Sequence, residues 1–350
     1  MQKVNLPKDI GLIYKSLPAD RKVKVRVGKD GKPFYIWPNM FSLPPHVMKA
    51  ISKNNMHFVY PPFASTSFKH IPWIINLCGD ADEYENAMKA LNENFKNVPI
   101  FNHPKGIMRS RRDRSASILE GIEKFDVPKC IRLSPNHFSD FENTFKKNNF
   151  SFPVIVRPAR SQSSVGVIKV DNVADWRTFE SLPWANNHYY MTQFVDFSTK
   201  TKTKNIVYAK GRVMFIGKKV YFRHLFLHNH WQINMRKQIG DSKKQREEEY
   251  DHISKIKKSE NFKNIINKVR DRIGLDGFIL DFGWDFETQS ATFFEVSAAA
   301  QLDYSELLSP FEGEKSEQIN KDYKKSDIDL VNILNSPEAW INYKSVTTYD

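Results

Sequence analysis

Residues 278–300 read FILDFGWDFETQSATFFEVSAAA, a pattern typical of two strands joined by a turn. Asp281 and Asp285 lie on the first strand, where residues four apart share one face. Glu295 lies in the second, within the otherwise apolar and β-prone run 292–296. A carboxylate there is costly unless a positive charge compensates it. A shared Mg²⁺ would do so, and acids that face water or an arginine are the equal alternative.

The composition indicates a globular protein of two or three domains. A chain of 350 residues is too long for one simple core. Its content of 40% hydrophobic and 13% aromatic residues is typical of a globular protein. The net charge of +13 favours an anionic partner, such as nucleotide phosphates, acidic peptide, nucleic acid or a membrane surface. A solvated, lysine-rich surface is the common alternative.

The cysteines and the apolar runs indicate a cytoplasmic protein. Cys78 and Cys130 suggest neither a disulfide framework nor a metal site, as expected in a reducing compartment. The N-terminal residues show no secretory signal, and the longest apolar runs are too short to cross a bilayer. We therefore expect no membrane partner.

Short strand and helix patterns alternate over the first hundred residues, which predicts a small α/β domain with a partly parallel sheet. Gly31 marks the turn of an expected hairpin. In parallel sheets ligands bind beyond the carboxyl ends of strands. Asn76, Asp80 and Asp82, around the end of one apolar run, are therefore candidate substrate contacts. Capping of the next helix is the favoured alternative.

A cluster of arginines precedes a helix expected over residues 113–123. Arg109, Arg111, Arg112 and Arg114 lie just before or at its start, where cations oppose the helix dipole. An anion recruited to that end would explain them, since backbone N–H groups there bind phosphates. A basic surface patch or a nucleic-acid contact remains the alternative.

A second basic position lies in residues 151–170, SFPVIVRPARSQSSVGVIKV. Arg157 interrupts an apolar strand, as Glu295 does, and a small polar loop ending at Gly166 follows. Backbone amides of such a loop can cover phosphates while an arginine contacts them from the strand. Serine-rich hairpin turns without this role are also common.

The remaining segments follow in a recognisable order. A strand over residues 189–194 precedes a hairpin opened by Lys210, Gly211 and Arg212, and residues 240–258 form a charged connector or exposed helix. An amphipathic helix ends at Gly274 and leads into the acidic hairpin. His224, His228 and His230 lie close together, which we attribute to packing and not to a metal site.

This order of motifs resembles the ATP-grasp superfamily over roughly residues 70–303, with FPVIVRPxxSxxSxG, YYMTQF and LDGFILDFGWD…FFEV as its main elements. It is most similar to glutathione-synthetase-like and ribosomal-protein-glutamylating ligases. The resemblance implies an α/β and α+β fold in which two antiparallel-sheet subdomains hold ATP behind a small N-terminal α/β domain. It divides the chain into residues 1–104, a central subdomain 105–188, a C-terminal subdomain 189–310 and a charged tail 311–350.

Carried over by position, the resemblance implies a role for each motif. Arg212 and Arg157 steady the transferred phosphoryl group. Asp281 and Glu295 bind Mg²⁺, and Ser297 stands where the family usually has an asparagine. Nucleotide contacts fall to Arg112, Arg114, Arg157, Ser161, Ser163, Ser164, Gly166, Gln193, Phe194, Val195, Asp196 and Lys210.

The implied activity is ATP-dependent ligation of a carboxylate to an amine, or to a thiol, through an acyl phosphate, with a peptide or protein as one expected substrate. The implied cofactors are ATP and Mg²⁺. An ATP-grasp phosphotransferase, or a nucleotide-binding protein with a degenerate site, is the alternative. The charge leaves an anionic macromolecule as a further partner, and a dimer is one expected assembly.

Overall fold

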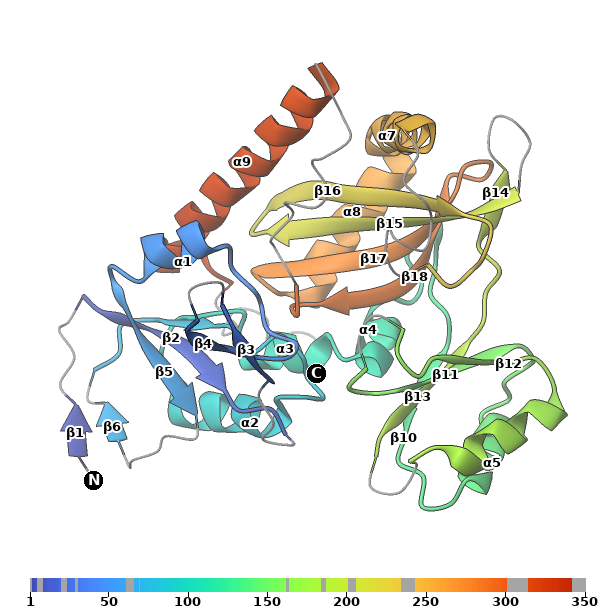
Figure 1. Cartoon of the computed structure of the whole chain (residues 1–350), viewed down its shortest axis with the longest axis horizontal. Coiled ribbons are helices and arrows are strands. Elements are labelled where there is room, and N and C mark those ends of the chain that lie inside the picture. The colour runs from blue at the N-terminus through green and yellow to red at the C-terminus, as the bar shows by residue number, and fades with distance from the viewer. Residues whose placement is uncertain are drawn as a thin grey trace.

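The computed structural model describes residues 2–4, 9–19, 24–28, 31–60, 66–68, 70–161, 164–183, 187–200, 206–233, 243–300 and 314–341. Three larger sheets organise these residues (Figure 1). One belongs to the N-terminal part, a second to the central part, and the third carries the acidic hairpin. None of the described helices is both long and apolar enough to cross a membrane.

The N-terminal sheet is parallel, in the order β5 (Asn55–Tyr60), β2 (Gly11–Ser16), β7 (Ile74–Asn76) and β8 (Ile100–Phe101). Each strand is short and apolar, and Leu12, Ile13, Ile74 and Ile75 are fully buried. Helices α1 (Pro45–Ile51) and α2 (Glu85–Asn94) accompany the sheet, and β1 (Gln2–Val4) pairs with β6 (Thr66–Phe68). The expected hairpin is β3 (Lys24–Val27) and β4 (Pro33–Ile36), and Gly31 in its turn has a positive φ of 75°.

The central sheet is antiparallel, in the order β10 (Cys130–Leu133), β13 (Tyr189–Gln193), β11 (Val154–Pro158) and β12 (Ile168–Val170). Helix α5 (Ser139–Lys147) and the 3₁₀ segment η1 (Val173–Ser181) cover one face through an aromatic core of Phe141, Phe179 and Tyr189. Two helices precede this sheet, α3 (Pro104–Arg109) and α4 (Arg112–Leu119). Because α4 packs on both β10 and the C-terminal sheet, it lies where the two parts meet.

The C-terminal sheet contains β14 (Ser198–Lys200), β15 (Ile206–Ile216), β16 (Lys219–His228), β17 (Gly277–Asp285), β18 (Ser290–Ser297) and β9 (Phe125–Asp126). All its pairs are antiparallel except β18 with β9. Helix α8 (Glu260–Ile273) buries Phe262 and Val269 against the core, and Gly274 ends it in the left-handed region, as predicted. A parallel domain followed by two antiparallel sheets confirms the predicted fold class.

The charged segment predicted as a connector or exposed helix is α7 (Lys243–Lys258), and it is not fully solvated. Arg246, Glu249 and His252 are buried. Glu249 accepts a hydrogen bond from the backbone N–H of Leu227 at 3.1 Å, and Gln245 donates to the carbonyl of Leu227 at 2.8 Å. The helix therefore lies along the outer edge of β16.

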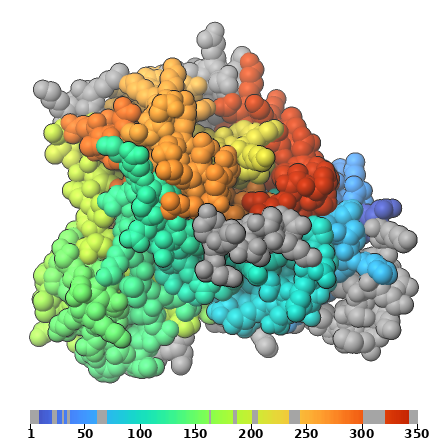
Figure 2. Space-filling view, turned by 180° about the vertical axis from the view of Figure 1, so that it is seen from behind, coloured from blue at the N-terminus to red at the C-terminus, as the bar shows by residue number. Residues whose placement is uncertain are grey.

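The charged tail contains a 21-residue helix, α9 (Glu314–Leu334), followed by η3 (Pro337–Ala339). Figure 2 shows this segment on the rear face beside the C-terminal sheet and α8. Asp329 of α9 pairs with Lys219 at 2.6 Å, while Leu330 and Leu334 are buried with Phe101 and Trp340. The segment thus ties the C-terminal sheet to the N-terminal domain.

Candidate functional site

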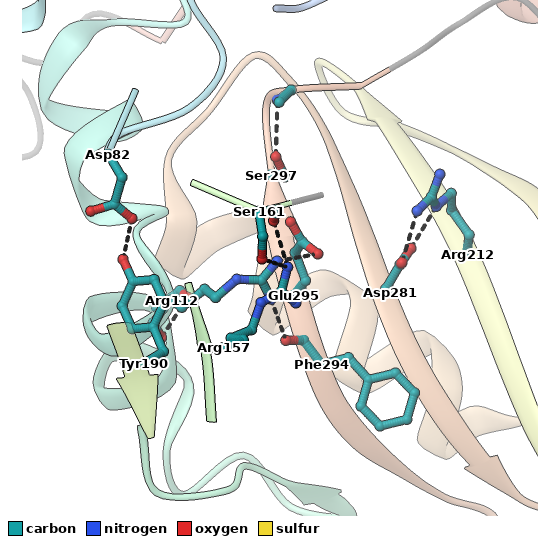
Figure 3. Close-up of polar contacts among 12 residues, drawn as sticks. Asp82, Arg112, Arg157, Ser161, Tyr190, Arg212, Asp281, Phe294, Glu295 and Ser297 are labelled. Atoms are coloured by element: carbon teal, nitrogen blue, oxygen red, sulfur yellow. Dashed lines mark hydrogen bonds and ion pairs between the residues drawn. The ribbon is translucent and has the colours of Figure 1, made fainter. Parts of the chain in front are cut away.

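The two carboxylates of the acidic hairpin lie side by side. Strands β17 and β18 place Asp281 opposite Glu295, and a register shift after Asp281 places Phe294 outside the regular pairing. Ser297, two residues beyond Glu295, shares its face. Asp281 is 3% exposed and Ser297 is 7% exposed. The three predicted metal-binding side chains therefore occupy one face of one hairpin (Figure 3).

Strand β15 supplies the cations that hold Asp281. Arg212 is the cross-strand partner of Asp281 and donates to both carboxylate oxygens, at 2.5 Å and 2.8 Å. Lys210, two residues earlier, lies 3.2 Å from the same carboxylate. Burial alone would raise the pKa of Asp281, but the charges of Arg212 and Lys210 outweigh it and hold the pKa well below its usual range.

Arg112, the first residue of α4, reaches Glu295 from the central part of the chain. Its Nη2 lies 2.6 Å from Oε2 of Glu295, and its Nη1 donates to the carbonyl of Phe294 at 3.3 Å. Burial opposes ionisation of Glu295, yet Arg112 and then Arg157 lower its pKa. The sequence predicts that the arginines at the start of α4 bind an anion. One anion bound there is the carboxylate of Glu295.

Arg157, at the end of β11, differs from the other arginines of the cluster because its hydrogen bonds to described residues go to neutral oxygens. Its Nη2 donates to the carbonyl and the hydroxyl of Ser161, at 2.6 Å and 3.2 Å. Its Nε is buried and has no hydrogen-bond partner within the described part of the chain. Burial, and then the charge of Arg112, lower the pKa of Arg157 to about 10.

Other predicted nucleotide contacts lie around this cluster. Ser164 and Gly166 both have positive φ, at 55° and 71°, in the turn after β11, while Ser163 lies outside the described residues. Arg114 is exposed on α4 and joins the cluster through no contact within the described residues. The amide of Gln193 is used internally, since its Nε2 donates to the carbonyl of Pro153 at 3.0 Å.

The linker after β13 carries the predicted adenine and ribose contacts. The ring of Phe194 lies 5.8 Å from that of Trp231, and Nζ of Lys169 lies 4.7 Å above it. Val195 is half-buried, and Asp196 is exposed and accepts a hydrogen bond from the backbone of Ser198 at 3.0 Å. An aromatic surface next to an exposed carboxylate is suited to a base and its sugar.

The turn after β7 contacts the hairpin directly. A Cβ at Gly79 would come within 2.5 Å of the backbone of residues 298–299, so only glycine allows this approach. Asp80 accepts hydrogen bonds from the N–H groups of Asp82 and Glu83, at 2.9 Å and 2.8 Å, within the turn that precedes α2. The N-cap of α2 is Tyr84 and has no side-chain cap, so the alternative that these residues cap the next helix is wrong. Burial raises the pKa of Asp80 to about 7, and the charges of Asp82 and Glu295 add to this shift.

Asn76 and Asp82 have different surroundings. Asn76 lies inside the N-terminal domain, where its amide donates to the carbonyl of Asn102 at 2.9 Å. Asp82 instead reaches the central sheet, where Arg132 contacts it at 2.9 Å and the hydroxyl of Tyr190 donates to it. Sequence reasoning found neither Tyr190 nor Arg132, because a tyrosine and an arginine on strands carry no distinguishing signal.

The acidic hairpin of the C-terminal sheet meets Arg157 of the central sheet and Arg112 of α4 in one cluster, and the turn after β7 of the N-terminal sheet contacts the hairpin. This is the arrangement that the order of motifs predicts. The arrangement of the sheets is consistent with an ATP-grasp fold.

No family model and no curated protein matches this chain. Among solved structures, D-alanine–D-alanine ligase from Bacillus anthracis is similar with a TM-score of 0.48 and 13% identity, over 94% of this chain and 98% of that one. An ATP-grasp RimK-domain protein from Sphaerobacter thermophilus has a TM-score of 0.46 and 10% identity, over 92% and 98%. Carboxyaminoimidazole ribonucleotide synthase from Aspergillus clavatus, complexed with ATP, has a TM-score of 0.45 and 11% identity, over 72% and 66%; this chain spans just under two thirds of it.

The donor set of this hairpin fits Mg²⁺ completed by phosphate oxygens. Two carboxylates and a hydroxyl on one face are hard oxygen ligands, and Mg²⁺ usually takes only one or two carboxylates from a protein. The described residues contain no group of three or more His, Cys, Asp or Glu that could hold a metal alone. Asp285, the other acid of β17, binds Thr199 at 2.9 Å and Thr288 at 2.6 Å in the hairpin turn.

Proposed function

We propose that this chain is an ATP-dependent ligase that joins a carboxylate to an amine, or to a thiol, through an acyl phosphate. Arg157 carries the proposal. It is a partly buried arginine whose buried Nε has no hydrogen-bond partner among the described residues, beside a second arginine that lowers its pKa. Together Arg112, Arg157, Lys210 and Arg212 set four cations against two carboxylates. A surplus of desolvated positive charge favours binding of phosphate oxygens.

The residues of the cluster divide the work by position. In phosphoryl transfer most of the rate comes from positioning and from neutralising charge. Arg157 and Arg212 flank the hairpin and would hold the terminal phosphoryl oxygens. Mg²⁺, bound by Asp281, Glu295 and Ser297, would supply further neutralisation of the phosphate charge.

The chemistry balances without a nucleophile from the protein. A carboxylate oxygen of the substrate takes the terminal phosphoryl group, which gives an acyl phosphate and ADP. The amine then attacks the acyl carbon, phosphate leaves, and the amine loses a proton as the amide forms. The same cations would neutralise the tetrahedral oxyanion of this second step. The net charge of +13 supports a peptide or protein with acidic groups as one substrate.

Both cysteines are free, Cys78 buried and Cys130 partly buried, which supports action in the reducing cytoplasm. The partners proposed are therefore ATP, Mg²⁺, a carboxylic acid and an amine of that compartment.

The test is a trapping assay. Purified protein is incubated with ATP, Mg²⁺, hydroxylamine and a panel of carboxylic acids and acidic peptides, and hydroxamate and ADP are measured. Hydroxylamine captures an acyl phosphate, so a ligase gives equal amounts of both with at least one acid. Arg157→Ala should abolish both products, whereas Arg177→Ala, an exposed arginine of the same subdomain, should not. ADP with a stable phosphorylated substrate would instead establish a phosphotransferase, and no ADP with any acid would favour a degenerate site.

A further inference from the structure

Asp82 joins the N-terminal domain to the central sheet. It lies in the turn after β7 and is 7% exposed. Nε of Arg132 lies 2.9 Å from its Oδ1, and the hydroxyl of Tyr190 donates to its Oδ2. Nε of Arg160 also donates to its backbone carbonyl at 3.3 Å. Three residues on or beside the central sheet, Arg132, Arg160 and Tyr190, therefore converge on one residue of the N-terminal part (Figure 3 shows Asp82 with Tyr190).

These three residues occupy neighbouring positions around the phosphate-binding strand. Tyr190 is the cross-strand partner of Arg157 on β11 and also of Arg132 on β10. Arg160 follows β11 directly and precedes Ser161, which accepts hydrogen bonds from Arg157. A displacement of Asp82 relative to the sheet would therefore move Arg157 and Ser161 with it.

The other side of the same turn is fixed to the acidic hairpin. Gly79 packs against the backbone of residues 298–299, which follow Ser297. The N–H of Gly79 donates to the carbonyl of Asn39 at 3.3 Å, and Asp80 closes the turn. The turn therefore contacts both the hairpin that carries Glu295 and Ser297 and the sheet that carries Arg157.

We propose that Asp82 is a positioning residue that holds Arg157 in register with the Asp281–Glu295 pair and keeps the acyl phosphate enclosed. The inference rests on the proposed function. The reaction needs groups from two sheets at one phosphoryl group, and a small displacement of either is costly in rate. A gap between the sheets would also admit water, which hydrolyses an acyl phosphate before the amine attacks.

A buried carboxylate with charge-assisted hydrogen bonds suits this task. Such bonds are short and directional. When one partner is lost, the charge of the other stays buried without a compensating charge. Tyr190 is fully buried, and burial together with Asp82 raises the pKa of its hydroxyl, which keeps it a donor.

The experiment compares Tyr190→Phe and Asp82→Asn with Tyr189→Phe in the full-length protein. Tyr189 is the sequence neighbour of Tyr190, and its hydroxyl donates to the carbonyl of Pro183 at 3.1 Å within the central subdomain. Hydrogen exchange of β11 and β12 is measured without ligand, and the ratio of hydroxamate or amide to ADP is measured during turnover. Tyr190→Phe removes one hydroxyl, so it tests the inference even if Asp82→Asn fails to fold.

Tyr190→Phe should speed exchange in β11 roughly tenfold, as loss of one buried hydrogen bond to a charge allows. It should also lower the product-to-ADP ratio severalfold, because ADP then forms without product. Tyr189→Phe should leave the ratio unchanged. Equal exchange and equal ratios in Tyr190→Phe and Tyr189→Phe would overturn the inference. If the wild type makes no product at all, the proposed function fails, while the exchange measurement still decides whether Asp82 fixes β11.

Discussion

The side chains of this cluster differ in how far the sequence alone predicts their positions. Arg157 and Glu295 could be predicted because a charge within an apolar strand needs a reason, and both lie at the cluster. That Arg112 would pair with Glu295 could not be predicted, since the two residues lie 183 positions apart and arginines nearby looked equivalent. Arg114, two residues after Arg112 on α4, is exposed.

The first prediction concerns Arg157. ATP with Mg²⁺ should raise the melting temperature of the wild type, since ligand at one hundred times its Kd stabilises by about 2.7 kcal/mol. Arg157→Ala should lose most of this shift, because the Nε of Arg157 is buried and has no hydrogen-bond partner among the described residues. The measurement is a thermal melt with and without ATP, with Arg177→Ala as the control. A full shift in Arg157→Ala would remove this residue from the phosphate site.

The second prediction concerns Glu295. Glu295→Gln should remain folded, because the amide oxygen can still accept a hydrogen bond from Arg112. Turnover should fall by at least ~10²-fold, as when one preorganised electrostatic group is removed. Asp285→Asn is the matched control, since Asp285 accepts hydrogen bonds from Thr199 of β14 and from Thr288 in the hairpin turn. A larger loss in Asp285→Asn than in Glu295→Gln would show that the metal carboxylate is misassigned.

Helices and strands were predictable to different degrees. The amphipathic helix α8 and its Gly274 end agree with the sequence pattern because both signals are local. Helix α7 looks exposed in sequence, yet it is partly buried because its partner is the backbone edge of β16, which no local pattern reveals. The sequence predicts a charged tail where α9 lies. Its helical packing could not be predicted, because the weak apolar stripe of α9 packs against elements that are distant in sequence.

The third prediction concerns the turn that joins two elements at Gly79. Gly79→Ala places a methyl group within 2.5 Å of backbone atoms of residues 298–299, which cannot yield as a side chain would. We expect a loss of about 1–3 kcal/mol in the free energy of unfolding, as for overpacking elsewhere, and a loss of turnover. Urea unfolding and the trapping assay measure the two effects. Gly121→Ala, at a positive φ of 75° with nothing within 4 Å, should lose stability through its backbone strain but keep its turnover. Wild-type behaviour of Gly79→Ala would mean that the turn and the hairpin lie further apart.

At the scale of the whole molecule, the buried carboxylate of Asp276 connects three parts of the chain, and no sequence pattern indicates this connection. Its carboxylate accepts hydrogen bonds from the N–H of Asn102 at 2.8 Å and of Ile341 at 2.7 Å. Asn102 in turn bonds both backbone groups of Gly277, at 2.8 Å each. One buried acid therefore connects the N-terminal domain, the start of β17 and the C-terminal segment.

The fourth prediction is a pH dependence that arises at this junction. Burial raises the pKa of Asp276 to about 6, above about 3.9 for an unfolded aspartate. The folded state binds this proton more tightly, so the stabilisation is complete below about pH 4 and is lost as the pH rises through about 6. The unfolding free energy of the wild type relative to Asp276→Asn should therefore fall by up to about 3 kcal/mol between about pH 4 and about pH 7.

Denaturant unfolding at several pH values measures this difference. Asp271→Asn, at an exposed acid near the end of α8, serves as the control and should leave the pH profile of the wild type unchanged. A constant difference between the wild type and Asp276→Asn across this range would show that Asp276 does not titrate there.

The contacts that α7 makes with Leu227 have a consequence for association between molecules. Glu249 accepts a hydrogen bond from the N–H of Leu227, and Gln245 donates one to its carbonyl. A neighbouring strand would bond the same two backbone groups. An uncovered edge is where folded proteins recruit foreign strands and begin to aggregate. To extend the sheet at Leu227, a second chain would have to displace a carboxylate that is 3% exposed. The charged helix α7 thus occupies the place at Leu227 that a further strand would need, so we expect the sheet not to extend there.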